Sequence, residues 1–223
     1  MPRPVLVIAL LACLGACATQ PANLGERKTQ LVSYHADGGY DRDLAAVDQD
    51  AETWLRASAP RATRPALVLD IDETSLSNWP QLAANDFGYI PGGTCDALPA
   101  GPCGSVAWEL SARATVIAPT LALFNTAKTA GVAIFFITGR PENERDATAR
   151  NLRVAGYDGW TGLTLKPVTL HVASAADYKT AERAKIEAQG FTIIANVGDQ
   201  PSDLSGGHAS RTFLLPNPFY RIP

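Results

Sequence analysis

The segment LVLDIDETSLSN contains the residues of this chain with the clearest chemical potential. An apolar run at residues 66–69 is followed directly by Asp70 and then by Asp72. Such a run is typical of a buried parallel strand, and ligands collect beyond the carboxyl ends of these strands. Since Asp72 would return to the same side as Asp70, the pair can share a divalent cation and a phosphate. The alternative without function is a strand that ends in an Asx or Thr turn.

Further polar residues follow two later apolar runs. The carboxyl ends of parallel strands meet at one edge of a sheet, so we expect these residues to converge there. The set offers a nucleophile, a second carboxylate, a hydroxyl, a cation and acids for a metal, which are the parts that phosphoryl transfer needs. Taken singly, each has an ordinary explanation as a turn, capping or surface residue. The additional residues are Thr138 and Gly139, Lys179 in YKTAER, and Asp199 and Asp203 in GDQPSD.

The alternation of apolar runs with helical segments predicts the elements that position these residues. It is typical of an α/β fold with a doubly wound parallel sheet. The segment at residues 79–118 interrupts the alternation, and we expect it, with the first helix, to form a small helical and loop cap over the active edge. Strands are predicted at residues 66–69, 132–137, 163–165, 191–197 and 212–215, and helices at 40–58, 119–130, 142–155 and 175–189.

Residues 17–60 are predicted to be an extended polar linker followed by a packing helix at residues 40–58. Leu44, Leu55 and other apolar residues recur on one face of this helix. Its acidic residues, Asp48 among them, are expected to form a solvated face.

The composition and the first residues indicate where the protein acts. A formal charge of −3 with 19 basic residues gives no basic surface for nucleic acid. Residues 1–16 resemble a lipoprotein signal peptide, with LGAC predicting lipid attachment at Cys17 and Cys13 offering a weaker site. The expected location is the bacterial envelope, on the outer membrane facing the periplasm. An ordinary secretory signal peptide is the alternative.

Two further cysteines, Cys95 and Cys103, lie in a loop rich in glycine and proline. Because disulfides persist in an oxidising periplasm, export favours a bond between them. A zinc site would need four ligands, and no histidine lies near either thiol in the sequence. Two free thiols remain the other alternative.

Four motifs in order, DIDET, TGR, YKTAER and GDQPSDL, resemble those of the haloacid dehalogenase (HAD)-like phosphatases. Their forms are similar to subfamily IIIB, which holds bacterial class C lipoprotein acid phosphatases and plant vegetative storage acid phosphatases. NLRVAGYDGW and RTFLLPNPFY support the resemblance, which covers residues 61–223. It implies a Rossmann-like core with a small cap and hydrolysis through an aspartyl-phosphate intermediate.

The resemblance also implies a role for each matching residue. Gly139 stands where class C lipoproteins often carry Asn, and with the short cap this departure leaves substrate preference open. The implied nucleophile is Asp70, and the implied general acid and base is Asp72, which also contacts Mg²⁺ through its main-chain carbonyl. The implied phosphate-binding residues are Thr138, Gly139 and Lys179. Asp199 is implied to bind Mg²⁺ directly, and Asp203 through a water molecule.

These observations predict an exported Mg²⁺-dependent acid phosphatase for small organic phosphates, such as nucleoside monophosphates or aryl phosphates. Trp79, Trp108 and Tyr220 are candidate walls of its substrate pocket, with ordinary core aromatics as the alternative. A dehalogenase is disfavoured because Asp72 supplies the proton that an alkoxide leaving group requires. The competing hypothesis is an anchored binding or storage protein for a phosphorylated ligand without turnover.

Overall fold

The computed structural model describes residues 21–222, and its centre is a five-stranded parallel sheet. The strand order β5-β4-β1-β6-β7 places β1 in the middle, as predicted for a doubly wound sheet. β4 continues four residues beyond its predicted end at residue 137, through an irregular segment beside β5. The strands are β1 (Pro65–Leu69), β4 (Ala133–Pro141), β5 (Gly162–Lys166), β6 (Thr192–Gly198) and β7 (Thr212–Leu214).

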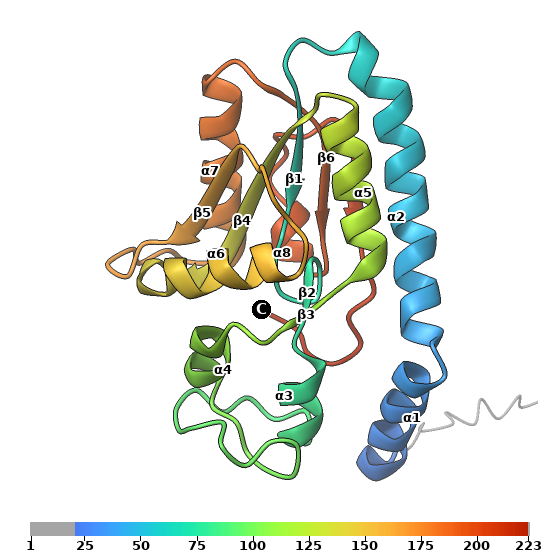
Figure 1. The fold of residues 1–223 in the computed structure, drawn as a ribbon, viewed down its shortest axis with the longest axis vertical. Helices are drawn as coiled ribbons and strands as arrows, with labels where there is room; N and C mark the ends of the chain where they lie inside the picture. Colours follow the sequence, from blue (N-terminus) through green and yellow to red (C-terminus); the bar gives the residue numbers. More distant parts are fainter. Residues whose placement is uncertain (1–20, 223) are drawn as a thin grey trace, which may run out of the picture.

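Helices cover both faces of the sheet, which explains why the central strand β1 is apolar throughout (Figure 1). Leu67 and Leu69 point to the face covered by α2 (Gly39–Ser58) and α5 (Ala118–Thr129). Val68 points to the other face and packs in the cluster that contains Tyr178 of α7 (Ala175–Ala188). The remaining helical elements of this core are η1 (Ala59–Arg61), η2 (Glu142–Glu144), α6 (Arg145–Val154) and α8 (Pro201–Leu204).

The predicted cap is inserted through a two-stranded ribbon. β2 (Leu76–Ser77) pairs antiparallel with β3 (Thr115–Val116), so the chain leaves and re-enters the core at the same point. Between these strands lie α3 (Trp79–Ala84), a long loop and α4 (Ser105–Ser111), which sit below the carboxyl edge of the sheet in Figure 1. We call residues 79–114 the cap. The predicted disulfide between Cys95 and Cys103 is confirmed and closes the cap loop.

The N-terminal region differs from the sequence-based expectation. Residues predicted to be an extended linker include α1 (Leu24–Ala36), which the Asn23 side chain caps by accepting a hydrogen bond from the Glu26 amide at 3.2 Å. α2 packs beside α5 against the sheet rather than over the active edge. α1 reaches the cap instead, where the His35 ring stacks on Trp79 with 3.7 Å between ring centroids. α1 has no fully buried residue, and its Leu31 and Tyr34 are only partly buried against the core.

The predicted signal peptide, residues 1–16, lies outside the described residues, as do Cys13 and the lipidation candidate Cys17. Among residues 21–222, none of the helices combines the length and apolar character needed to cross a lipid bilayer.

Asp48 of α2 is buried, which corrects its assignment to a solvated face. Its side chain is 3% exposed, and its Oδ2 accepts a hydrogen bond from Thr120 of α5 at 2.9 Å. Within residues 21–222, its Oδ1 has no hydrogen-bond partner. Burial therefore raises the pKa of Asp48 from 3.8 to about 7, with the Thr120 hydrogen bond opposing that shift.

Replacing Asp48 by Asn is expected to stabilise the protein more at pH 8 than at pH 5. The folded state keeps the Asp48 proton up to a pKa of about 7, whereas the unfolded chain releases it near its ordinary value. Stability is therefore lost as pH rises between these values. At about 1.4 kcal/mol per pH unit, the gain in unfolding free energy should be about 2 kcal/mol larger at pH 8 than at pH 5. Urea unfolding at both pH values measures this difference.

The control is Asp50→Asn on the same helix, where the carboxylate is exposed and pairs with Arg211. Its effect should differ little between the two pH values, because an exposed pair contributes at most about 1 kcal/mol. An equal gain from Asp48→Asn at both pH values would contradict the assignment of a buried, protonated Asp48.

Candidate active site

Asp70 lies at the carboxyl end of β1, where a tight turn directs the residues after it. Its amide donates to the Val197 carbonyl at 3.0 Å, which continues the pairing of β1 with β6. The amides of Ser75 and Leu76 then both donate to the Ile71 carbonyl at 2.8 Å. Glu73 adopts a φ of 51° within this turn. The turn gives the carboxylates of Asp70 and Asp72 different partners.

The predicted acidic cluster forms from Asp70, Asp199 and Asp203, whose carboxylate oxygens lie within 4.8 Å of one another. Lys179 enters it from α7, and its Nζ donates to Asp70 Oδ1 at 2.5 Å and to Asp203 Oδ1 at 2.6 Å. All four side chains are buried. Strands β1 and β6 and helix α7 thus bring residues from three distant motifs together at one edge of the sheet.

Several hydrogen-bond donors hold Asp199 and Asp203 in place. Asp199 accepts from Thr74 Oγ1 at 3.1 Å, from Gln200 Nε2 at 2.6 Å and from Asn217 Nδ2 at 2.7 Å. Asp203 Oδ2 accepts from the Gln200 amide at 2.9 Å. The sequence analysis did not single out Gln200 or Asn217. Gln200 lies within GDQPSDL and Asn217 within LPNPFY, so both stood inside recognised motifs.

Burial is the main influence on the charges of this cluster. It raises the pKa of Asp70 well above its ordinary value, an effect that the Lys179 charge opposes and Asp203 adds to. Burial followed by the charge of Asp203 raises the pKa of Asp199 to about 7. Although burial alone would lower the pKa of Lys179, the attraction of Asp70 and Asp203 outweighs it, so the ammonium stays charged. Lys179 thus pairs with two of the three carboxyl groups of the cluster.

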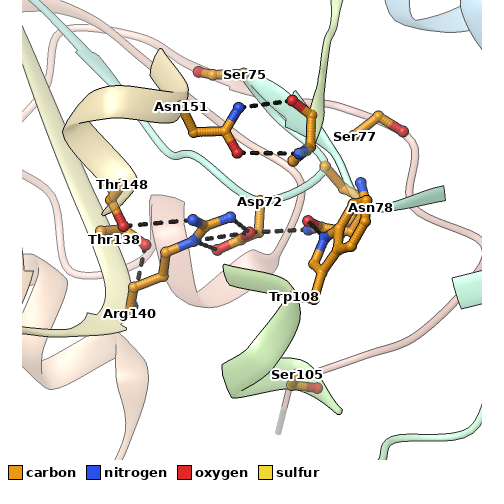
Figure 2. Close-up of polar contacts among 12 residues, drawn as sticks. Asp72, Ser75, Ser77, Asn78, Ser105, Trp108, Thr138, Arg140, Thr148 and Asn151 are labelled. Atoms are coloured by element: carbon orange, nitrogen blue, oxygen red, sulfur yellow. Dashed lines mark hydrogen bonds and ion pairs between the residues drawn. The ribbon is translucent and has the colours of Figure 1, made fainter. Parts of the chain in front are cut away.

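Asp72 lies in a separate network, which Figure 2 shows in close-up. Arg140 Nη2 donates to Asp72 Oδ1 at 2.6 Å, and its Nε lies 3.1 Å from both carboxylate oxygens. Asn78 Nδ2 also donates to Oδ1, at 2.9 Å. Burial would raise the pKa of Asp72, but the Arg140 charge and these hydrogen bonds outweigh burial and hold it below its ordinary value.

The cap supports this network through Trp108. The indole Nε1 of Trp108 donates to Asn78 Oδ1 at 2.7 Å, which orients the Asn78 amide toward Asp72. The Trp108 side chain is buried, and the Trp79 ring is stacked on His35. Trp108 is thus buried, whereas Trp79 is partly buried, and their proposed place in a substrate pocket stays a prediction.

Tyr220 reaches the site through Glu73, another residue that the sequence analysis passed over. Tyr220 Oη donates to Glu73 Oε2 at 2.5 Å, and the Asn78 amide donates to Glu73 Oε1 at 2.6 Å. Burial and the nearby Asp72 charge raise the pKa of Glu73 to about 7. The carboxy-terminal tail is thereby joined to the turn after β1.

Thr138 and Gly139 lie on β4, next to β1. Thr138 is fully buried, and its Oγ1 accepts a hydrogen bond from the Arg140 amide at 3.1 Å. Gly139 is exposed, and a Cβ atom there would meet nothing within 4 Å. A side chain could therefore begin at this position without a clash at its Cβ atom.

Comparison with known proteins identifies the class of this protein. A family model for the HAD superfamily, subfamily IIIB (acid phosphatase), matches residues 14–223. The chain is accordingly a phosphoric monoester hydrolase. It belongs to the acid phosphatase family of HAD subfamily IIIB, as its motifs predicted.

Relatives in plants and bacteria share this sequence or fold. The chain is 35% identical to the stem 28 kDa glycoprotein of Glycine max over 82% of its own length and 70% of the relative. It is 31% identical to acid phosphatase 1 of Solanum lycopersicum, over 85% of this chain and 72% of that relative. The class C acid phosphatase from Bacillus anthracis has a similar fold, with a TM-score of 0.67, 22% identity and coverage of 87% of this chain and 86% of that one.

Replacing Arg140 is expected to move the pH dependence of hydrolysis. If Asp72 delivers a proton to the leaving group, the rate falls as pH rises through its pKa. Arg140 holds this pKa low, so Arg140→Gln should raise it and shift the fall in kcat/KM toward neutral pH by about one unit. Arg140→Lys, which keeps the charge but not the planar guanidinium, should give a smaller shift.

The measurement is kcat/KM against pH with a poor leaving group, because kcat/KM reports on the free enzyme. Arg153→Gln, on the exposed side of α6, is the control and should keep the wild-type profile. Thermal unfolding verifies that each variant is folded. A folded Arg140→Gln variant with the wild-type profile would show that Arg140 does not tune Asp72.

Proposed function

We propose that this protein is an exported, Mg²⁺-dependent acid phosphatase that cleaves small organic phosphate monoesters through an aspartyl-phosphate intermediate. The observation that carries the proposal is the convergence of Asp70 with Lys179, Asp199 and Asp203 at one edge of the sheet. It combines a carboxylate nucleophile, a cation for the phosphoryl oxygens and an oxygen-rich set of metal ligands.

In this proposal the acidic cluster binds and attacks the phosphoryl group, and the network around Asp72 transfers protons. Asp70 Oδ attacks phosphorus, while Lys179 and Thr138 hold the phosphoryl oxygens. Asp72 gives a proton to the leaving alkoxide and then takes one from the water that hydrolyses the aspartyl phosphate. The Arg140 and Asn78 hydrogen bonds fix Asp72 in place for both steps.

The acidic cluster fits Mg²⁺ by its chemistry. Its donors are carboxylate oxygens, which hard cations prefer, and one lysine leaves negative charge uncompensated among the three aspartates. Asp70 and Asp199 would hold the ion directly, with Asp203 acting through water and Asp72 through its carbonyl. The ion would neutralise charge on the phosphoryl group.

Asp70→Asn is expected to lower kcat at least about 10³-fold, because an amide cannot act as the nucleophile. Chelation should abolish turnover by the wild type, and added Mg²⁺ should restore it. Release of inorganic phosphate from an aryl phosphate measures both effects. The exposed Asp50→Asn variant is the control and should keep wild-type turnover. Full activity of Asp70→Asn would rule out the covalent mechanism.

A binding or storage protein without turnover is the second candidate, because relatives include a protein named vegetative storage protein 1 from Arabidopsis thaliana, which is 31% identical. The same assay separates the two functions. Wild-type protein that binds phosphate with Mg²⁺ but releases none from any ester in a panel of nucleotides, sugar phosphates and aryl phosphates would favour storage.

For substrates, we propose nucleoside monophosphates and aryl phosphates, with Tyr220 beside the leaving group. Tyr220→Ala should raise KM for these substrates at least about fivefold, since base stacking on an aromatic ring contributes about 1–3 kcal/mol. KM for glycerol phosphate should change less. Tyr220→Phe keeps the ring but loses the hydrogen bond to Glu73, so it separates stacking from support of the turn. Equal losses for all substrates in Tyr220→Ala would contradict a stacking role.

We further propose that the mature protein begins at Cys17 and is anchored in the outer membrane by acyl chains. Cys17→Ser should move the protein from the membrane fraction to the soluble fraction, because the acyl chains supply the apolar burial that retains it. Fractionation and mass spectrometry of the amino terminus measure this. An unmodified amino terminus at another residue would contradict lipidation without affecting the catalytic proposal.

A further inference from the structure

The segment after β7 lies against the acidic cluster, and we call its residues 215–222 the tail. The Leu215 amide donates at 2.9 Å to the carbonyl of the last residue of β6, which extends the pairing of β7 with β6. Phe219 is buried, and its ring packs on Tyr40 of α2 and Trp79 of the cap, with 4.9 Å and 5.4 Å between ring centroids. The tail is thus held by the sheet, by α2 and by the cap.

Two side-chain amides converge on one oxygen of Asp199. Oδ2 accepts hydrogen bonds from Gln200 Nε2 at 2.6 Å and from Asn217 Nδ2 at 2.7 Å. Within residues 21–222, Oδ1 accepts one hydrogen bond, from Thr74 Oγ1 at 3.1 Å. Because each carboxylate oxygen has about two acceptor positions, Oδ2 is fully used by the amides. Oδ1 is therefore the oxygen of Asp199 with a position left for a cation.

The main chain of the tail fixes the orientation of both amides. Asn217 Oδ1 accepts from the Phe219 amide at 3.0 Å. Gln200 Oε1 accepts from the Ile222 amide at 3.0 Å. Since a main-chain donor holds the oxygen of each side-chain amide, its NH₂ group must face Asp199. A flipped amide would turn its oxygen toward the carboxylate and its NH₂ group toward a main-chain N–H.

The sequence of the tail restricts its backbone around Asn217. Pro216 has a fixed φ, and Pro218 disfavours a helical conformation of the residue before it, Asn217. Proline lacks an N–H, but the donors used by the amides belong to Phe219 and Ile222. The prolines therefore stiffen the tail without removing a hydrogen bond on which the orientation of the amides depends.

We propose that the tail is part of the metal site, with Asn217 and Gln200 as positioning residues that turn Asp199 Oδ1 toward the cation. The tail main chain orients the two amides, and the amides orient the carboxylate. Removing a hydrogen-bond partner of a metal ligand typically weakens metal binding about 10–100-fold. The inference rests on the proposed Mg²⁺ dependence, and it makes the tail a determinant of the affinity for Mg²⁺.

The first test uses Asn217→Ala in the full chain. The Kd for Mg²⁺ is measured by calorimetric titration of protein freed of metal by a chelator, in the absence of substrate. This Kd should rise at least about tenfold, because Oδ2 loses a donor and the carboxylate can turn away from the cluster. At saturating Mg²⁺, Asn217→Ala should regain most of the wild-type kcat for an aryl phosphate, which a variant with a general folding defect would not do.

The second test removes a single main-chain donor. Ile222→Pro lacks the N–H that holds Gln200 Oε1, whereas Ile222→Ala keeps this N–H and shortens the same exposed side chain. Ile222→Pro should raise the Kd for Mg²⁺ at least about threefold, the effect of losing one hydrogen bond. Ile222→Ala should stay within about twofold of the wild type. Thermal unfolding of the metal-free proteins verifies that each variant is folded.

The outcomes distinguish this inference from the proposed function. A wild-type Kd in folded Asn217→Ala would overturn the role of Asn217, and equal Kd values in the two Ile222 variants would overturn the role of the tail main chain. Wild-type protein that hydrolyses phosphate monoesters but binds no Mg²⁺ would overturn the inference and leave the hydrolysis. Mg²⁺ binding that depends on the tail, in a protein without phosphatase activity, would support the inference and overturn the proposed function.

Discussion

The dominant constraint on this structure is the burial of three aspartates around one lysine at the carboxyl edge of the sheet. Asp70 and Asp203 each bond Lys179 Nζ, and Asp199 lies within reach of both carboxylates. Buried carboxylates are costly unless they are paired, hydrogen-bonded or bound to a metal. Much of the surrounding structure supplies this compensation, through donors from the turn after β1, from α8 and from the tail at Asn217.

The two aspartates of DIDET are close in sequence but have opposite electrostatic surroundings. Asp70 faces Lys179 within a group of carboxyl groups, and its pKa is raised by burial. Asp72 faces the Arg140 guanidinium, and its pKa is lowered. The tight turn at Glu73 gives the two carboxyl groups these different partners. For Asp70 to act as nucleophile and Asp72 as proton donor, a bound cation would have to lower the pKa of Asp70 and a bound phosphate raise that of Asp72.

Side chains, in addition to the β2–β3 ribbon, connect the cap to the residues around Asp72. Trp108 Nε1 donates to Asn78 Oδ1, and Asn78 in turn donates to Asp72. α1 adds a further contact to the cap from outside, through the stack of His35 on Trp79. A change in the position of α4 would therefore alter the orientation of Asn78 and, through it, of Asp72.

The sequence by itself determined the parallel sheet and the residues that gather at its carboxyl edge, although β4 runs past its predicted end. Apolar runs that end in Asp70, Thr138 and Asp199 can be recognised locally. Because parallel strands have their carboxyl ends on the same side, these residues are expected at one edge of the sheet. Cys95 and Cys103 were likewise identified from a loop of turn-forming residues, and the structure joins them.

Tertiary structure alone decided which partner each of these groups has. Arg140 and Asp72 are separated by 68 residues, and Tyr220 and Glu73 by 147, so no local pattern reveals either contact. The same holds for Asp48, which α5 covers, and for α1, which contacts both α2 and Trp79 of the cap. Periodicity records which faces are apolar, whereas the pairing of polar groups depends on how distant elements pack.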